Sequence, residues 1–257
     1  MAERKKMNRL KILSFNMHKG FSAANRRFVL HDMKDEIERH GADLVFLQEV
    51  QGENRRLGNR IRNWPNLSQF EFLADKMWPH TAYGKNALYD DGHHGNAILS
   101  RHPFESWENI DISSSSLERR GILHGVVRVE QGSLKCPPLH VLCIHLSLLE
   151  SDRMSQIRTL ARRIQDHIPS DEPIILAGDF NDWRQSASAI LSKESRLDEA
   201  FLSLHGRHAK TFPSFMPVLR LDRVYTRGCR IFSANTLREQ PWDSLSDHLG
   251  LEVELGF

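Results

Sequence analysis

Side chains able to do acid-base and metal chemistry recur where apolar runs of this sequence end. The segment ILAGDFNDW at 175–183 passes from an apolar run directly to Asp179, Asn181 and Asp182. One such ending is an ordinary turn, but the other apolar runs end in the same way. They carry Asn16 after LKILSF, Glu49 after LVFLQ, His145 after LHVLCI, Asp222 within LRLDRVY, and Asp247 and His248 in LSDH. Because neighbouring strands can bring their ends to one rim, we expect these residues to form one site.

The donor types in this set indicate a divalent cation and phosphoryl chemistry. Carboxylate and amide oxygens are the ligands of Mg²⁺ or Mn²⁺, whereas zinc favours sets richer in His and Cys. A cation also relieves the repulsion among clustered carboxylates. A His held by a carboxylate can orient or deprotonate water, and an acid can protonate a leaving oxygen. Each residue taken singly has an ordinary structural explanation. A site is favoured because all of them are placed at the ends of predicted strands.

The elements that must position these residues are readable from apolar periodicity. Strand-sized apolar runs are LKILSF, ADLVFLQ, NAILS, ILHGVVRV, LHVLCIHL, PIILAG, LDRVY and GLEVEL. Helical spacing joins Leu30, Met33 and Ile37 before Gly41, and a second helix runs from Met154 to Ile168. Residues 95–146 read as strands only, which predicts mixed sheets. We expect an α/β (α+β) fold in which two sheets pack face to face with helices outside.

Length and composition predict one soluble domain. The 257 residues are 40% hydrophobic and 26% charged with a net charge of +2, which excludes disorder and a strongly basic backbone binder. We expect a single domain over 1–257, with 1–8 a flexible basic tail. Basic clusters at 55–63, 118–120 and 161–163 are solvated surface or local patches. Three unpaired cysteines, no signal peptide and no transmembrane segment predict a cytoplasmic protein.

Five short motifs in one order resemble a known superfamily. SFN, LQE, GDFND, LDRVY and SDH, spread over residues 14–248, resemble the endonuclease/exonuclease/phosphatase superfamily, which includes pancreatic-type deoxyribonuclease. A bacterial branch is most similar. The resemblance implies a four-layer αββα sandwich. It also implies that Glu49 is the principal metal ligand, with Asn16 and Asp247 beside the metal, and that Asp179 and Asn181 position the attacking water and contact the phosphate.

The same resemblance implies roles for the histidines and arginines. His248 matches the essential His, and Asp222 matches the carboxylate that orients it. His145 resembles a second His near the leaving group. Arg119 or Arg120, in ERRGIL, is expected to supply charge to the substrate phosphate.

Further polar and aromatic residues have two open interpretations. In DGHHGNAILSR at 91–101, His94 and Asn96 are candidates for substrate binding, and the alternative for this stretch, including His93, is an ordinary loop. Trp183 and Trp242 flank the predicted site in sequence. Each can stack a base, cover a lipid chain, or pack in the core.

The predicted function is a phosphodiester hydrolase that depends on Mg²⁺ or Mn²⁺, with DNA or RNA as the first substrate class. A lipid or small-molecule phosphodiester of the sphingomyelinase type is the alternative, and a catalytically silent binding scaffold is a third.

LQEVQ lacks the Thr-Lys that usually follows LQE in abasic-site endonucleases, and LRLDRVY keeps only the Asp-Arg of the inositol phosphatase motif. Both activities are therefore disfavoured. No obligate protein partner is readable.

Overall fold

The computed structural model describes residues 9–115, 118–131, 134–135 and 137–256, so the predicted basic tail at 1–8 lies outside the described residues. Its strands are β1 (Arg9–Asn16), β2 (Leu44–Asn54), β3 (His80–Tyr89), β4 (Gly92–Ser100), β5 (Phe104–Asp111), β6 (Gly121–Val127), β7 (Glu130–Gln131), β8 (Leu134–Lys135), β9 (Leu139–His145), β10 (Ile174–Asp179), β11 (Asp198–Glu199), β12 (Asp222–Arg227), β13 (Arg230–Leu237) and β14 (Gly250–Gly256). Its α-helices are α1 (Leu30–His40), α2 (Arg55–Arg60), α3 (Gln69–Ala74), α4 (Glu150–His167), α5 (Ser186–Ser195), α6 (Ala200–His205) and α7 (Trp242–Leu245), and short 3₁₀ turns η1 (His18–Gly20) and η2 (Ala23–Asn25) follow β1.

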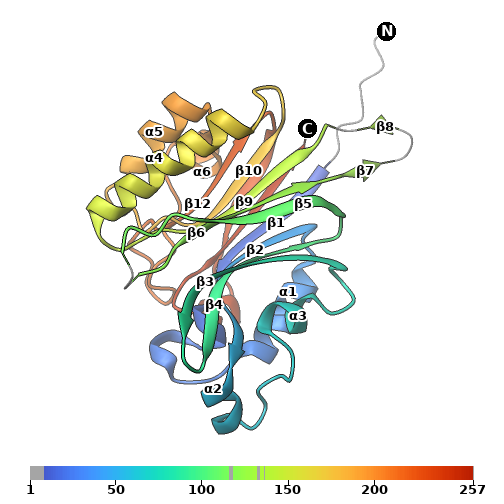
Figure 1. Cartoon of the computed structure of the whole chain (residues 1–257), viewed down its shortest axis with the longest axis vertical. Coiled ribbons are helices and arrows are strands. Elements are labelled where there is room, and N and C mark those ends of the chain that lie inside the picture. The colour runs from blue at the N-terminus through green and yellow to red at the C-terminus, as the bar shows by residue number, and fades with distance from the viewer. Residues whose placement is uncertain (1–8, 116–117, 132–133, 136, 257) are drawn as a thin grey trace.

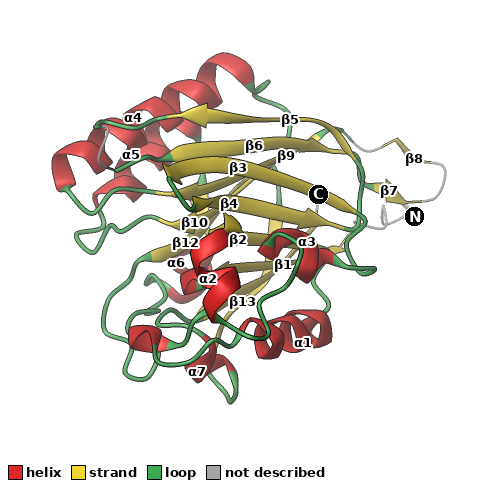
Figure 2. Ribbon diagram, turned by 60° about the horizontal axis from the view of Figure 1, so that its bottom comes forward, coloured by secondary structure: helices red, strands yellow, loops and turns green. Residues whose placement is uncertain are grey.

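Two six-stranded mixed sheets form the centre of the molecule. One sheet has the order β13-β14-β1-β2-β4-β3 and the other β11-β12-β10-β9-β6-β5. The pairs β1–β2 and β9–β10 are parallel, and the other strand pairs within these sheets are antiparallel. Helices α1 and α3 lie outside the first sheet and α4 and α5 outside the second (Figures 1 and 2). The predicted four-layer αββα sandwich is confirmed.

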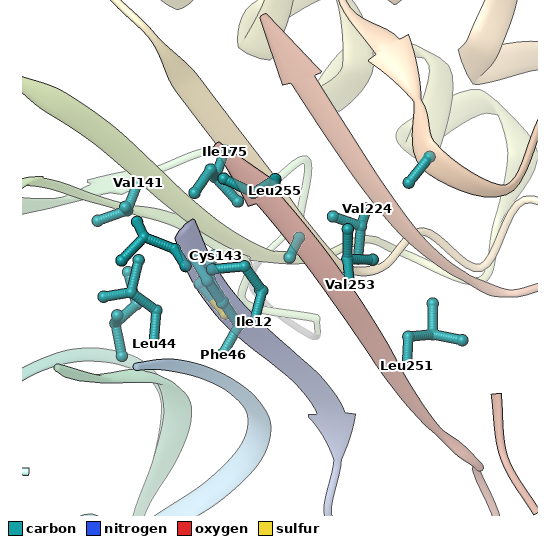
Figure 3. Packing of buried hydrophobic residues seen from close by; sticks show 14 of the residues in the cluster. Ile12, Leu44, Phe46, Val141, Cys143, Ile175, Val224, Leu251, Val253 and Leu255 are labelled. Atoms are coloured by element: carbon teal, nitrogen blue, oxygen red, sulfur yellow. The ribbon is translucent and has the colours of Figure 1, made fainter. Parts of the chain in front are cut away.

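The main core lies between the two sheets. Ile12, Leu44 and Phe46 of the first sheet are fully buried against inward side chains of the second, such as Val141 and Ile175 (Figure 3). Because successive residues of a strand point to opposite faces, alternate positions fill this core and the layers beneath the helices. The central strands are therefore buried on both faces, whereas the edge strands and the strand ends remain open to solvent.

The two predicted helices are present with the expected ends. Helix α1 stops at Gly41, whose φ of 67° is left-handed and whose N–H donates to the carbonyl of Ile37. Helix α4 buries Ile157 and Ile164 against the second sheet and stops before Pro169. Within the described residues, no helix combines the length and apolar character needed to cross a membrane.

The strands that the apolar pattern missed lie at the edges of the sheets. Strands β3, β5 and β13 each end a sheet, and much of each is partly or fully exposed. An edge strand packs one side only, so its sequence alternates weakly and carries more polar residues. All eight apolar runs named above fall on strands.

Gly178 fixes the backbone immediately before Asp179, and we expect alanine there to be strongly destabilising. Its φ is 149°, and a Cβ would lie 2.0 Å from the carbonyl oxygen of Ile144 in the neighbouring strand. Gly178→Ala should lower the free energy of unfolding in urea by at least about 3 kcal/mol. Gly206→Ala is the matched control: φ is 66° but the space is open, so the left-handed penalty of about 1 kcal/mol alone applies. Equal losses in both variants would contradict this prediction.

Candidate active site

One rim of the sandwich holds a cavity of about 270 Å³ where strands from both sheets end. We call it the rim cavity. Its lining residues are Glu49, Arg120, His145, Leu148, Asp179, Asn181, Trp183, Phe212, Leu219, Leu221 and His248. Residues separated by almost two hundred positions thus face one space. The polar side chains occupy part of the wall, and the rest is apolar.

Glu49 reaches the rim cavity from an irregular point in β2. The register between β2 and β4 shifts between Leu47 and Val50, and Glu49 has a left-handed φ of 57°. Such a bulge redirects a side chain, and left-handed backbone in a non-glycine residue costs energy that functional sites commonly retain. Burial raises the pKa of Glu49, but His145 and Lys19 lower it, and the result is about 2. Glu49 is therefore an anion at neutral pH, with Lys19 Nζ 3.5 Å from its Oε2.

Asp179 is the centre of the polar cluster. Strand register places it beside His145 on β9 and Asp222 on β12. Its Oδ2 accepts from Nδ2 of Asn16 at 3.0 Å, and its Oδ1 accepts from the backbone N–H of Asn181 at 2.9 Å. Burial is the main cause that raises the pKa of Asp179, and the nearby Asp222 adds to it. The carboxylate is held from two sides while one oxygen still faces two histidines.

His248 forms a dyad with Asp222. Its Nδ1 lies 2.9 Å from Oδ2 of Asp222, which leaves Nε2 directed toward Asp179 with 3.8 Å between Nε2 and Oδ2. Burial lowers the pKa of His248, but the carboxylates of Asp222 and Asp179 raise it to about 10. The Phe212 ring packs against the imidazole with centroids 5.0 Å apart. Orientation and charge of this ring are thus both set by its neighbours.

His145 and Asn181 complete the wall beside Asp179. Nε2 of His145 lies 3.5 Å from Oδ2 of Asp179. Burial, together with Arg120, holds the pKa of His145 well below its usual value. Asn181 has a left-handed φ of 48° and donates from Nδ2 to the carbonyl of Leu146 at 2.9 Å. The two histidines of the cluster therefore differ: His248 is held charged and His145 is held neutral.

Not every predicted site residue reaches the rim cavity. Of the two arginines, Arg120 lines it, whereas Arg119 is exposed and pairs with Asp111 at 3.0 Å. Asn96 is buried and donates to the carbonyls of Gly121 and Cys143, so it links the two sheets and offers no free amide. Neither Arg119 nor Asn96 is among the lining residues of the rim cavity.

Asn16, Asp247 and His94 lie around the cavity without lining it. Asn16 uses Oδ1 to accept from the N–H of His18, so both ends of its amide are engaged. Asp247 faces His18, with Oδ1 3.7 Å from Nδ1. Burial, and after it Lys19, lowers the pKa of His94 to about 4.

The two tryptophans and His93 lie in three different parts of the structure. Trp183 lines the rim cavity, and the guanidinium of Arg153 lies 4.6 Å from its ring centroid. Trp242 begins α7 and packs edge-to-face on Phe15, in the core cluster that also holds Met33 and Ile37 of α1. His93 bonds to the Tyr83 hydroxyl and lines a second cavity of about 490 Å³ instead.

The sequence patterns did not single out the polar neighbours of Glu49 and Asp247, nor the apolar lining residues Leu148, Phe212, Leu219 and Leu221. Lys19 and His18 stand beside Glu49 and Asp247, and Phe212 covers His248. The signal for the first two was their position directly after β1, in NMHKG. Phe212 lies in a loop without periodicity, so its contact was not readable.

The donor set fits a hard divalent cation. Asp179, Asp222 and His248 offer ligand atoms that all lie within 4.8 Å of one another. Nδ1 of His248 is already bonded to Asp222, however, and Asp222 Oδ1 is buried without a hydrogen-bond partner among the described residues. Glu49 adds an ionised carboxylate to the same cavity. Ionised carboxylate oxygens such as those of Glu49 are what Mg²⁺ and Mn²⁺ bind.

Solved structures of similar proteins share this fold. An endonuclease/exonuclease/phosphatase from Beutenbergia cavernae superposes with a TM-score of 0.72 at 20% identity, over 97% of this chain and 72% of that chain. TDP2 of D. rerio superposes with a TM-score of 0.71 at 20% identity, over 97% of this chain and 100% of that chain. At 20% identity, these similarities show that the fold is shared.

Sequence comparisons identify the family. The chain is 45% identical over 246 residues to the protein YbhP of Escherichia coli strain K12, covering 95% of each. The profile of the Endonuclease/Exonuclease/phosphatase family matches residues 13–248. This range contains every residue of the cluster described above, from Asn16 to His248. The chain belongs to the Endonuclease/Exonuclease/phosphatase family.

Proposed function

We propose that this protein is a metal-dependent phosphodiester hydrolase. The observation that carries the proposal is the convergence of Glu49, Asp179 and His248 on one cavity. An anionic carboxylate, a buried acid and an oriented imidazole are the groups that phosphodiester hydrolysis needs for holding a cation and transferring protons.

Each polar residue has a role that its contacts support. His248, oriented by Asp222, and Asp179 face the cavity together, so a water held between Nε2 and Oδ2 can pass a proton to the Asp179 carboxylate while the charged imidazole orients it. Asn16 and Asn181 hold the carboxylate of Asp179 in place. His145 stands on the other side of Asp179, where it can assist the leaving oxygen.

The substrate phosphate and the metal ion need separate partners. Arg120 is the arginine that lines the cavity, and we assign to it the contact with the phosphate. Glu49 would hold the ion, with the predicted neighbours Asn16 and Asp247 behind it. When bound, Mg²⁺ or Mn²⁺ supplies charge stabilisation to phosphate oxygens.

Two substrate classes have support. For nucleic acid, the similar TDP2 of D. rerio has been solved complexed with single-strand DNA product, and Trp183 can stack a base. For a lipid phosphodiester, the support is the apolar part of the wall, which includes Leu148, Leu219 and Leu221. The single-domain organisation and the cytoplasmic location predicted from the sequence remain predictions.

Hydrolysis of a soluble aryl phosphodiester tests the activity itself. We expect turnover with Mg²⁺ or Mn²⁺ and loss of at least about a hundredfold in EDTA, because the ion stabilises phosphate charge. Restored turnover after the ion is added back is the control against unfolding. A folded protein that neither binds Mn²⁺ nor hydrolyses the diester would instead be the silent scaffold.

A further inference from the structure

Large apolar side chains are exposed on loops that contribute residues to the lining of the rim cavity. They come from three loops and are 38 to 74% exposed: Leu148, Leu149, Trp183, Phe215, Met216, Val218 and Leu219. We call this set the apolar collar. Three of its members, Leu148, Trp183 and Leu219, also line the cavity, so the collar and the cavity are continuous. Gathered apolar exposure of this kind marks an interaction surface.

The most exposed part of the collar is a tight hairpin that is tied to the site. Phe212 and Leu219 pair as a β-bridge, and the N–H of Met216 donates to the carbonyl of Pro213. Ser214 anchors the hairpin, because its N–H donates to the carbonyl of Asp247 and its hydroxyl to that of Ser246. The base of the hairpin is therefore tied to residues 246–247, directly before His248. Phe215 at the tip of the hairpin is 74% exposed.

A cationic pocket of about 550 Å³ adjoins the same hairpin. Its lining includes Arg207, Lys210, Arg220 and Arg238, together with Pro217 between two collar residues. No Asp or Glu is among its lining residues. Within the described part of the chain, none of these four cations forms an ion pair. The pocket is thus an uncompensated patch of positive charge beside an exposed apolar tip.

We propose that the apolar collar and the cationic pocket dock the protein onto an anionic phospholipid surface, with the rim cavity over a lipid phosphodiester. The apolar tip would enter the acyl boundary, and the four cations would bind the anionic headgroups. Five of the seven collar residues are Leu, Val or Met, which bury well among hydrocarbon chains, and base stacking would have only the rings of Trp183 and Phe215. The proposal deepens the lipid alternative of the proposed function and rests on that function for its substrate.

Sedimentation of the full chain with vesicles in EDTA tests docking without turnover. Two compositions are used, phosphatidylcholine alone and two parts phosphatidylcholine to one part phosphatidylglycerol. We expect binding to the anionic vesicles, and a loss of about tenfold or more when Phe215→Ser and Met216→Ser are combined. Arg207→Gln with Lys210→Gln should weaken binding to the anionic vesicles by about tenfold and should remove much of its salt dependence.

Trp107→Ser is the matched control, because Trp107 is 49% exposed on β5 and lines neither the rim cavity nor the cationic pocket. It should bind vesicles like the original chain. Binding to neither vesicle type, or unchanged binding by the hairpin variant, would overturn the proposal. Loss of single-stranded DNA binding by the hairpin variant, with no vesicle binding by the original chain, would assign this face to nucleic acid and equally overturn it.

The hydrolase proposal is tested apart from docking in the same experiment. His248→Ala should sediment with anionic vesicles as the original chain does, because His248 is buried behind the hairpin. Vesicle binding by a chain that hydrolyses no diester would leave docking standing and remove the proposed activity. Diester hydrolysis without vesicle binding would keep the proposed activity and overturn the docking proposal.

Discussion

Replacing His248 by alanine is expected to slow hydrolysis of a soluble aryl phosphodiester by roughly 10²- to 10⁴-fold, mainly in kcat. The imidazole faces both the cavity and Asp179, with Nε2 3.8 Å from Oδ2. Nε2 of His145 lies 3.5 Å from the same oxygen, but burial holds the pKa of that ring well below its usual value, so it cannot supply the same charge. Asp222→Asn should also lower kcat strongly, since it keeps the shape but removes the charge that faces Nδ1 of His248. Steady-state kinetics with saturating Mg²⁺ measures both effects.

His167→Ala is the matched control for this prediction. His167 is exposed at the end of α4, far from the residues that line the rim cavity, and its loss should change kcat by less than about twofold. Circular dichroism and thermal unfolding establish that each variant is folded. A folded His248→Ala protein with undiminished turnover would remove His248 from the mechanism.

Replacing Glu49 by glutamine is expected to abolish tight Mn²⁺ binding and to lower kcat/KM by roughly 10²- to 10³-fold. Glutamine keeps the size of the side chain and removes the negative charge that the pKa of about 2 makes permanent at neutral pH. The bulged, left-handed backbone at this position directs the carboxylate to the cavity, so no other residue of β2 can substitute for it. Calorimetric titration with Mn²⁺ and steady-state kinetics are the two measurements.

Glu53→Gln controls for the loss of one negative charge on the same strand. Glu53 is exposed and pairs with Arg55 at 2.7 Å, outside the rim cavity, so Mn²⁺ affinity and turnover should be unchanged. The titration also separates two positions for the ion. Retained Mn²⁺ binding in Glu49→Gln, with binding lost in Asp222→Asn, would place the ion at Asp179, Asp222 and His248 rather than at Glu49.

The sequence by itself determined the central strands, the two long helices and the polar residues at the strand ends. Strands buried on both faces and helices with one apolar face carry a periodic pattern that depends on local backbone geometry alone. Edge strands such as β5 were not readable because only one of their sides packs on a neighbour. The same limit explains why a loop residue such as Phe212 gave no signal although it contacts His248.

The tertiary structure decided how the side chains are used. Asn16, predicted beside the metal, donates from its amide to Asp179 across 163 positions of the chain, and no local pattern indicates that contact. Arg120 lines the cavity and Arg119 does not. The two residues directly precede β6, and successive residues of an extended chain point to opposite sides. The apolar collar is a tertiary feature as well, because its members come from loops whose sequences show no amphipathic pattern. Contacts between distant segments depend on strand order and register, and a local sequence pattern contains neither.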